Sequence, residues 1–291
     1  MGYLGSIEAG GTKFVCCVGT ENGEIIEKIS FPTMTPEKTI SNITSFFKDY
    51  KLDAIGIGSF GPVDLNKKSK TYGHITTTPK EHWRHFNFVG KIREHFPIPI
   101  GFSTDVNAAL LGETEWGAAK GYNSCIYMTV GTGIGIGVMV NDRLLQGLHH
   151  PEAGHIFVKR HPEDTFSGCC SFHHDCLEGM ASGPAIKKRW GKAGNELDAN
   201  EKVWELEAYY LAQALVNYIL ILSPEKLIIG GGVAKQKHLL PMVRENVVEM
   251  LNGYIQDKHI TSNIDRYITS PGLSDDAGIY GGLVLAKRAL A

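Results

Sequence analysis

Residues 124–140, SCIYMTVGTGIGIGVMV, run from an apolar stretch through a glycine- and threonine-rich turn into a second apolar stretch. Residues 3–18, YLGSIEAGGTKFVCCV, follow the same plan. β-Branched and aromatic residues favour strands, and glycine permits a tight turn between them. Because one plan recurs far along the chain, we expect two related α/β halves.

Strands and helices alternate outside these two hairpins. Apolar strand-like runs at 53–59 and 100–104 are each preceded or followed by segments of helical spacing. Such alternation is typical of α/β proteins. We place an N-terminal α/β domain at 1–115, to which a C-terminal helix near 276–290 could return. A C-terminal α/β domain then occupies 116–291.

The length and charge of the chain narrow the possible classes. It has 291 residues and a formal net charge of −2, with acidic and basic side chains mixed along its length. A nucleic-acid-binding protein would carry a basic face, and a membrane span would need about 18 consecutive apolar residues. Neither is present, and the N-terminal residues do not resemble a signal peptide. We therefore expect a cytoplasmic protein with reduced cysteines and with neither nucleic acid nor membrane as a partner.

Half of the histidines and half of the cysteines fall between His149 and Gly179, in HHPEAGHIFVKRHPEDTFSGCCSFHHDCLEG. Within it, Cys170-x-x-His173-x-x-Cys176 has the ligand types and spacing of a tetrahedral Zn²⁺ site, with His155 as the expected fourth ligand. Four protein ligands would make the zinc structural. The other interpretation is a loop with ordinary free thiols and surface histidines. If zinc binds, residues 149–180 form a zinc-binding insertion in the second domain.

An acidic residue, Asp105, follows the expected strand 100–104 and begins a helix candidate. Open α/β sheets bind their ligands at the carboxyl ends of strands, which makes Asp105 a candidate catalytic residue. Aspartate is equally common as the residue that caps a helix N-terminus. Local sequence leaves both interpretations open.

Three glycine-rich turns, 10–13, 131–135 and 230–232, each follow an expected strand. Glycine lets a backbone approach an anion closely and point its N–H groups at it. Thr12 and Thr132 add hydroxyl donors. Any one of these turns could be a plain hairpin, but the three together favour a polyphosphate held between two halves. The sequence lacks the P-loop pattern.

The segment Gly56-x-Gly58-x-x-Gly61 matches the dinucleotide-binding fingerprint by letter. That fingerprint requires a helix to begin where Pro62 stands in this chain. We therefore expect no dinucleotide site there.

Taken together, these motifs resemble the ROK family of sugar kinases, and the resemblance covers essentially the whole chain. The motifs are Glu8-Ala-Gly-Gly-Thr-Lys13, Thr104-Asp105-Val-Asn107, Gly131-Thr-Gly-Ile-Gly135, Glu152-Ala-Gly-His155, Cys170 to Cys176 running into Leu177-Glu178-Gly179, and Gly230-Gly-Gly232. The resemblance implies an α/β fold of two domains, the actin-like or sugar-kinase fold of the ribonuclease H-like class, with a cleft between the domains. It also implies a homodimer.

The resemblance further implies the roles of individual residues. Asp105 would be the catalytic base, and Asp105, Glu152, His155 and Glu178 would hold the sugar. Zinc would be bound by His155, Cys170, His173 and Cys176. ATP, with Mg²⁺, would be bound by Gly10, Gly11, Thr12, Lys13, Gly131, Thr132, Gly133, Gly135, Pro184, Gly231 and Gly232.

Two departures from the family's glucokinases are similar to its fructokinase branch. Glucokinases of the family usually have aspartate where this chain has Glu8, and a Cys-x-Cys pair where it has Cys170-Ser171 followed by His173. The resemblance therefore implies ATP-dependent conversion of D-fructose to D-fructose 6-phosphate. Glucokinase, mannokinase and N-acylmannosamine kinase are the alternatives within the family.

Two non-enzymatic interpretations remain. The family also contains sugar-responsive transcriptional regulators, which carry a helix-turn-helix ahead of the first phosphate loop. Here Glu8 begins that loop almost at the first residue, and a basic face is missing, so we expect no regulator. A simple zinc-binding module would leave the three glycine-rich turns unexplained.

Overall fold

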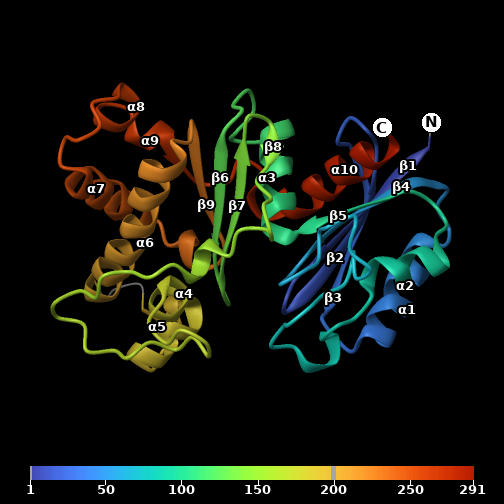
Figure 1. Cartoon of the computed structure of the whole chain (residues 1–291), viewed down its shortest axis with the longest axis horizontal. Coiled ribbons are helices and arrows are strands. Elements are labelled where there is room, and N and C mark those ends of the chain that lie inside the picture. The colour runs from blue at the N-terminus through green and yellow to red at the C-terminus, as the bar shows by residue number, and fades with distance from the viewer. Residues whose placement is uncertain (1, 198–200) are drawn as a thin grey trace. The chain divides into compact units, whose positions relative to one another are not determined.

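The computed structural model describes residues 2–197 and 201–291, which form two compact units (Figure 1). Unit 1 consists of Met1–Gly121, Leu145–His150 and Gly272–Ala291. Unit 2 consists of Tyr122–Leu144 and Pro151–Pro271. The expected domains were 1–115, to which a helix near 276–290 could return, and 116–291. In the structure residues 272–291 lie in unit 1, and so does the short segment Leu145–His150.

Unit 1 contains a five-stranded sheet of order β3-β2-β1-β4-β5. Its strands are β1 (Tyr3–Ala9), β2 (Lys13–Gly19), β3 (Ile25–Pro32), β4 (Leu52–Ser59) and β5 (Ile100–Thr104). The first three pair antiparallel, and β1, β4 and β5 run parallel. The carboxyl ends of the parallel strands therefore meet at one edge, which places the β1–β2 turn and the start of α3 there.

Helices cover both faces of this sheet (Figure 1). One face is covered by α1 (Pro36–Phe47) and α2 (Phe88–His95), and the other by α3 (Asp105–Trp116) and α10 (Ala277–Leu290). The adjacent Cys16 and Cys17 of β2 are both buried, the first in the core under α1 and the second in the core under α10. Alternation of side chains along a strand accounts for this division.

Gly56 and Gly58, which match the dinucleotide-binding fingerprint by letter, allow two helices to pack closely against the sheet. A Cβ atom on Gly56 would lie 1.8 Å from the carbonyl oxygen of Gly282 in α10. One on Gly58 would lie 2.6 Å from the Cβ of Ala108 in α3. The close approach of two helices explains these glycines without any nucleotide.

Unit 2 repeats the sheet of unit 1, with the order β10-β9-β6-β7-β8. Its strands are β6 (Cys125–Val130), β7 (Ile134–Val140), β8 (Arg143–Leu144), β9 (Lys226–Gly230) and β10 (Ile268–Thr269). Strands β6, β7 and β8 pair antiparallel, while β9 and β10 continue parallel to β6. Read from the hairpin outward, order and directions match unit 1, which confirms the expected pair of related α/β halves.

The helices of unit 2 are α4 (Leu177–Ala181), α5 (Gly183–Trp190), α6 (Glu201–Leu222), α7 (Leu239–Leu251), α8 (Lys258–Thr261) and α9 (Ile264–Tyr267). Side chains of α6, including Leu211 and Leu215, pack with Ile126 and Leu227 of the sheet in one core. Short 3-10 turns occur at Glu81–Trp83, Ala153–His155, Gly194–Glu196, Val233–Lys235 and Ser274–Asp276. No helix in 2–197 or 201–291 combines the length and the apolar character needed to cross a bilayer.

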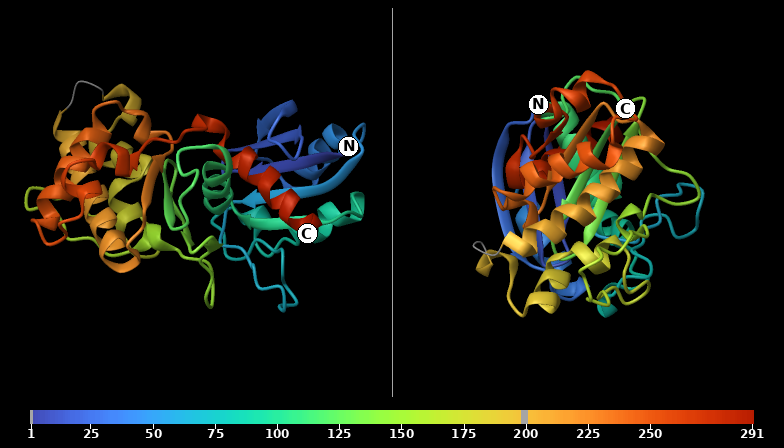
Figure 2. Two further views of the ribbon diagram at one scale, coloured as in Figure 1. Left: turned by 90° about the horizontal axis from the view of Figure 1, so that it is seen from above. Right: turned by 90° about the vertical axis from the view of Figure 1, so that its left-hand side faces the viewer.

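Residues 145–176 connect β8 to α4 with little regular structure, and Figure 2 shows residues 151–176 in yellow-green as extended loops. Hydrogen bonds attach these loops to the rest of unit 2 at several points. Leu177 donates its backbone N–H to Ile156, Lys159 bonds to Gln213 of α6, and the Tyr218 hydroxyl of α6 donates to Ala153. This segment carries the predicted zinc ligands.

Candidate active site and metal centre

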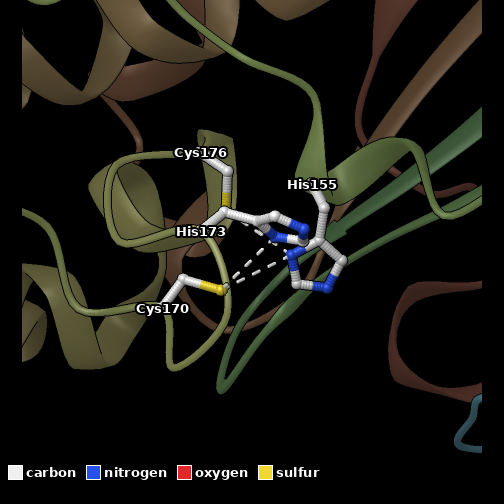
Figure 3. Close-up of side chains that lie close together, drawn as sticks. All are labelled: His155, Cys170, His173 and Cys176. Carbon is white, nitrogen blue, oxygen red and sulfur yellow. Dashed lines mark hydrogen bonds between the residues drawn. The ribbon is translucent and has the colours of Figure 1, made fainter.

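The structure brings the four predicted zinc ligands together (Figure 3). One ligand atom from each of His155, Cys170, His173 and Cys176 lies within 4.8 Å of the other three. Nδ1 of His155 is 3.5 Å from Sγ of Cys176 and 3.8 Å from Sγ of Cys170. Nδ1 of His173 is also 3.8 Å from the Cys170 sulfur.

These separations fit a tetrahedral zinc site. With Zn–S of about 2.3 Å and Zn–N of about 2.0 Å, sulfur and nitrogen ligands stand about 3.5 Å apart. Both cysteines are buried, His155 is half-buried and His173 is exposed. Burial raises the pKa of the Cys176 thiol to about 11, so a cation that binds there must displace its proton at neutral pH. The donor set and spacing therefore suit Zn²⁺.

Local backbone geometry holds Cys170 and His173 in one tight turn, and Cys176 follows as the residue that precedes α4. Cys170 and His174 exchange two backbone hydrogen bonds, both 3.1 Å long, so that His173 lies at the tip of the turn. His174 adopts a φ of 56°, a left-handed conformation that closes the turn. A Cβ on Gly179 would lie 1.9 Å from the His174 carbonyl oxygen, so the turn packs directly on α4.

His155 presents its two ring nitrogens to different groups. Nδ1 faces the thiols, whereas Nε2 lies 3.9 Å from Oε1 of Glu178. Glu178 in turn accepts a 3.0 Å hydrogen bond at Oε2 from the backbone N–H of Ile134. The structure thus joins the cluster to the β6–β7 hairpin through one carboxylate.

Glu152 begins the turn that carries His155, whose backbone N–H donates to the Glu152 carbonyl oxygen. Burial raises the pKa of the Glu152 carboxyl, His155 lowers it and Glu178 raises it further. The three side chains predicted to hold sugar from this unit therefore influence one another electrostatically. Carboxylates and an imidazole so arranged can hydrogen bond to neighbouring hydroxyl groups.

The predicted nucleotide-binding segments of unit 2 also converge. Gly131 bonds to Gly133 within the hairpin, and the N–H of Gly183 at the start of α5 donates to the Gly131 carbonyl oxygen over 2.8 Å. A Cβ on Gly131 would lie 4.0 Å from the backbone nitrogen of Gly232. Pro184 is exposed beside Gly183 in the first turn of α5. Strands β6 and β9 run parallel and end side by side, which explains the convergence.

The first glycine-rich turn joins β1 to β2 in unit 1. Gly10 donates its N–H to the Lys13 carbonyl oxygen over 3.0 Å, and the Thr33 hydroxyl donates to the Gly10 carbonyl. Thr12 and Lys13 are exposed. The turn can therefore offer a hydroxyl and an ammonium group to an anion.

Asp105 is the first residue of α3, and it is not the cap of that helix. Thr104 is the capping residue, because its side-chain oxygen accepts a 3.2 Å hydrogen bond from the Asn107 N–H. Oδ1 of Asp105 accepts from the N–H of Val106, and the side chain is half-buried at the carboxyl edge of the parallel strands. Asp105 is thus not the capping residue, although it satisfies one first-turn N–H and suits the positive end of the helix, and its catalytic role stays a prediction.

Glu8, at the end of β1, has a perturbed carboxyl group. Burial raises its pKa to about 7, helped by the charge of Asp105 and opposed by Lys13. From the sequence, Glu8 was only a difference from the family's glucokinases, and no role was predicted for it. Its position at the carboxyl end of a parallel strand, the same signal that singled out Asp105, could have identified it.

The sequence and the fold are both similar to those of known proteins. The sequence model of the family described as "ROK family" matches residues 4–289. A Bacillus subtilis protein is 55% identical over 99% of this chain and 96% of its own length. The fructokinase of Pediococcus pentosaceus is 46% identical over 99% of this chain and 98% of its own. The solved ROK hexokinase of Thermus thermophilus superposes with a TM-score of 0.81 at 24% identity, covering 99% of each chain.

Proposed function

Because the chain belongs to the ROK family, we propose that it is an ATP-dependent hexose kinase that converts D-fructose to D-fructose 6-phosphate. The strongest support is the near-complete coverage of fructokinases at more than 40% identity, which includes that of Streptococcus mutans at 44%. The alternatives, glucokinase, mannokinase and N-acylmannosamine kinase, are less favoured. The glucokinase of Thermotoga maritima, for example, is only 28% identical.

In the proposed mechanism, Asp105 acts on the attacking hydroxyl of the hexose. Its carboxylate accepts a hydrogen bond from this hydroxyl and takes its proton as the oxygen bonds to the γ-phosphorus of ATP. The bond from that phosphorus to ADP breaks in the same transfer. The position of Asp105 directly after β5, at the carboxyl edge of the parallel strands, supports this role.

Backbone N–H groups of the two hairpins, 10–13 and 131–135, would bind the ATP phosphates, with Thr12, Lys13 and Thr132 adding side-chain donors. Gly231, Gly232 and Pro184 would contact the adenosine. Mg²⁺ that enters with ATP supplies further positive charge for the phosphates. The convergence of Gly131, Gly183 and Gly232 in unit 2 supports this assignment.

Glu152, His155 and Glu178 would hold the hexose hydroxyls. His155 would bind Zn²⁺ through Nδ1 and leave Nε2 for the sugar, which agrees with the direction in which each nitrogen points. Zinc held by His155, Cys170, His173 and Cys176 would be structural and would keep these groups in place. The homodimer and the cytoplasmic location stay predictions.

The direct test is an assay of ADP release with D-fructose, D-mannose, D-glucose and N-acetylmannosamine as acceptors. We expect the highest kcat/KM with D-fructose and negligible ADP release without sugar. A higher kcat/KM with another hexose would change the proposed substrate but would leave the proposed kinase activity in place. ADP release that no sugar stimulates would contradict the proposed function.

A further inference from the structure

Glu178 has two oxygens with different surroundings. Oε1 faces Nε2 of His155 at 3.9 Å, whereas Oε2 accepts the N–H of Ile134 at 3.0 Å. Ile134 is the residue at which the hairpin 131–135 enters β7. One carboxylate therefore lies near His155, a predicted zinc ligand, and accepts a hydrogen bond from the hairpin that we assign to the ATP phosphates.

The hairpin leaves room for this carboxylate because residue 133 is a glycine. A Cβ atom on Gly133 would lie only 2.6 Å from Oε2 of Glu178. Any larger residue at 133 would therefore displace either the carboxylate or the hairpin. Closeness to Glu178, besides closeness to a phosphate, explains a glycine at this position.

The same part of the chain holds the hairpin at two further points. The carbonyl oxygen of Ile134 is covered by Gly154, where a Cβ would approach it to 1.8 Å, and Gly154 lies in the turn that carries His155. The Gly131 carbonyl accepts the Gly183 N–H, one residue beyond Ser182, which is bonded to the Glu178 backbone. Both ends of the hairpin are thus fastened to the elements that carry the metal cluster and Glu178.

We infer that Glu178 is a positioning residue for nucleotide binding, because its carboxylate fixes the phosphate hairpin relative to the Cys–His cluster. This inference rests on the proposed function and adds to it, since the proposed role of Glu178 there is to hold sugar. It follows that the metal-binding segment sets the affinity for nucleotide as well as for hexose.

The test uses calorimetric titration of the full-length, zinc-loaded protein with ADP and Mg²⁺ in the absence of sugar. Glu178→Ala removes the acceptor for Ile134, and we expect ADP to bind about tenfold more weakly, the scale of one lost hydrogen bond to a charged group. Glu178→Gln keeps an amide oxygen that can accept from Ile134. We expect this variant to bind ADP within about threefold of the original protein. Both variants should lose hexose affinity.

Glu163→Ala is the matched control, because Glu163 is an exposed carboxylate of the same segment, paired with Lys202. Its ADP affinity should be unchanged. Removal of zinc by a chelator should weaken ADP binding in the original protein and should add little in Glu178→Ala. Backbone hydrogen exchange of residues 131–135 should be faster both in Glu178→Ala and in the zinc-stripped original protein. If Glu178→Ala fails to fold, the exchange rate of the zinc-stripped protein still tests the inference.

Equal ADP affinity in the original protein and in folded, zinc-loaded Glu178→Ala would overturn the inference alone. Unchanged hairpin exchange after zinc removal would overturn it as well. If the original protein bound no ADP, the proposed function would fail together with it.

Discussion

At the scale of single residues, Glu8 should make stability depend on pH. Its folded pKa of about 7 lies above the ordinary value of 4.5, chiefly because of burial. The folded state therefore holds the proton more tightly, so this contribution to stability is full below pH 4.5 and is lost as pH rises through 7. The loss is on the order of 3 kcal/mol.

Glu8→Gln removes that ionisable group and should raise the free energy of unfolding relative to the original protein more at pH 8 than at pH 5. Denaturant titrations at the two pH values measure this difference. Glu21→Gln, an exposed carboxylate nearby in the sequence, is the control and should show the same offset at both. An identical offset for Glu8→Gln at the two pH values would mean that the carboxyl is not perturbed.

The metal centre can be tested by comparing two thiols, Cys176 and Cys169. Cys176→Ser should abolish zinc in elemental analysis and lower the melting temperature, since zinc bound by four ligands contributes folding energy. Cys169→Ser changes a neighbouring thiol outside the cluster and should keep the zinc. If Cys176→Ser kept its full zinc content, that result would contradict the proposed zinc site.

How far the sequence predicted the site depended on the distance between its parts. Cys170, His173 and Cys176 are close in sequence, so their spacing alone indicated the cluster that the structure confirms as a group of side chains. The contact of Glu178 with Ile134 joins positions far apart in the chain and depends on packing that no local pattern reveals. Thr104 and Asp105 are both good capping residues, so only the structure could decide between them.

At the scale of elements, a buried polar group fastens the metal-binding segment to α5 and α6. Asp164 accepts from the Tyr210 hydroxyl of α6 at 2.7 Å and pairs with Arg189 of α5 at 3.1 Å. Arg189 also donates to the Met180 carbonyl and lies over the Phe166 ring. The side chains of Asp164 and Arg189 are only 3% and 7% exposed, so neither charge can turn to water.

Asp164→Ala should therefore destabilise the protein by about 3–5 kcal/mol, because it leaves the buried Arg189 charge unpaired. Chemical denaturation measures the loss. Asp175→Ala is a suitable comparison, since Asp175 pairs with Arg160 at the surface, where a single ion pair contributes little. A loss for Asp164→Ala no larger than that for Asp175→Ala would show that the buried pair is not needed.

The elements themselves were predicted well where the local pattern was strong. The two hairpins and the helix expected near 276–290 correspond to β1–β2, β6–β7 and α10. Local sequence could not reveal which sheet face α10 covers. That choice depends on glycines in other elements, such as Gly56, which leave room for the helix backbone.

At the scale of the whole molecule, Glu113 joins two parts of unit 1, the end of its first segment near Gly121 and the start of its last segment at Gly272. Its buried carboxylate accepts the backbone N–H groups of Ala118, Gly272 and Leu273 over 2.6 to 2.9 Å. Glu113→Ala would leave these donors without this acceptor and should lower stability by several kcal/mol. Thermal unfolding measures this, and a melting temperature like that of the exposed control Glu115→Ala would contradict the prediction.

The two units share one sheet plan but would have different tasks in the proposed reaction. Unit 1 would contribute the base, Asp105, and unit 2 would contribute the sugar-holding side chains and the metal cluster. The account depends on Asp105 acting in the chemical step and not in maintaining the fold.

Single-turnover phosphoryl transfer to D-fructose by Asp105→Asn tests this most directly, with hexose affinity measured on the same preparation. We predict that the rate falls by about 10² to 10⁴, the usual contribution of a general base, while hexose still binds and the protein stays folded. Transfer at close to the original rate would contradict the account.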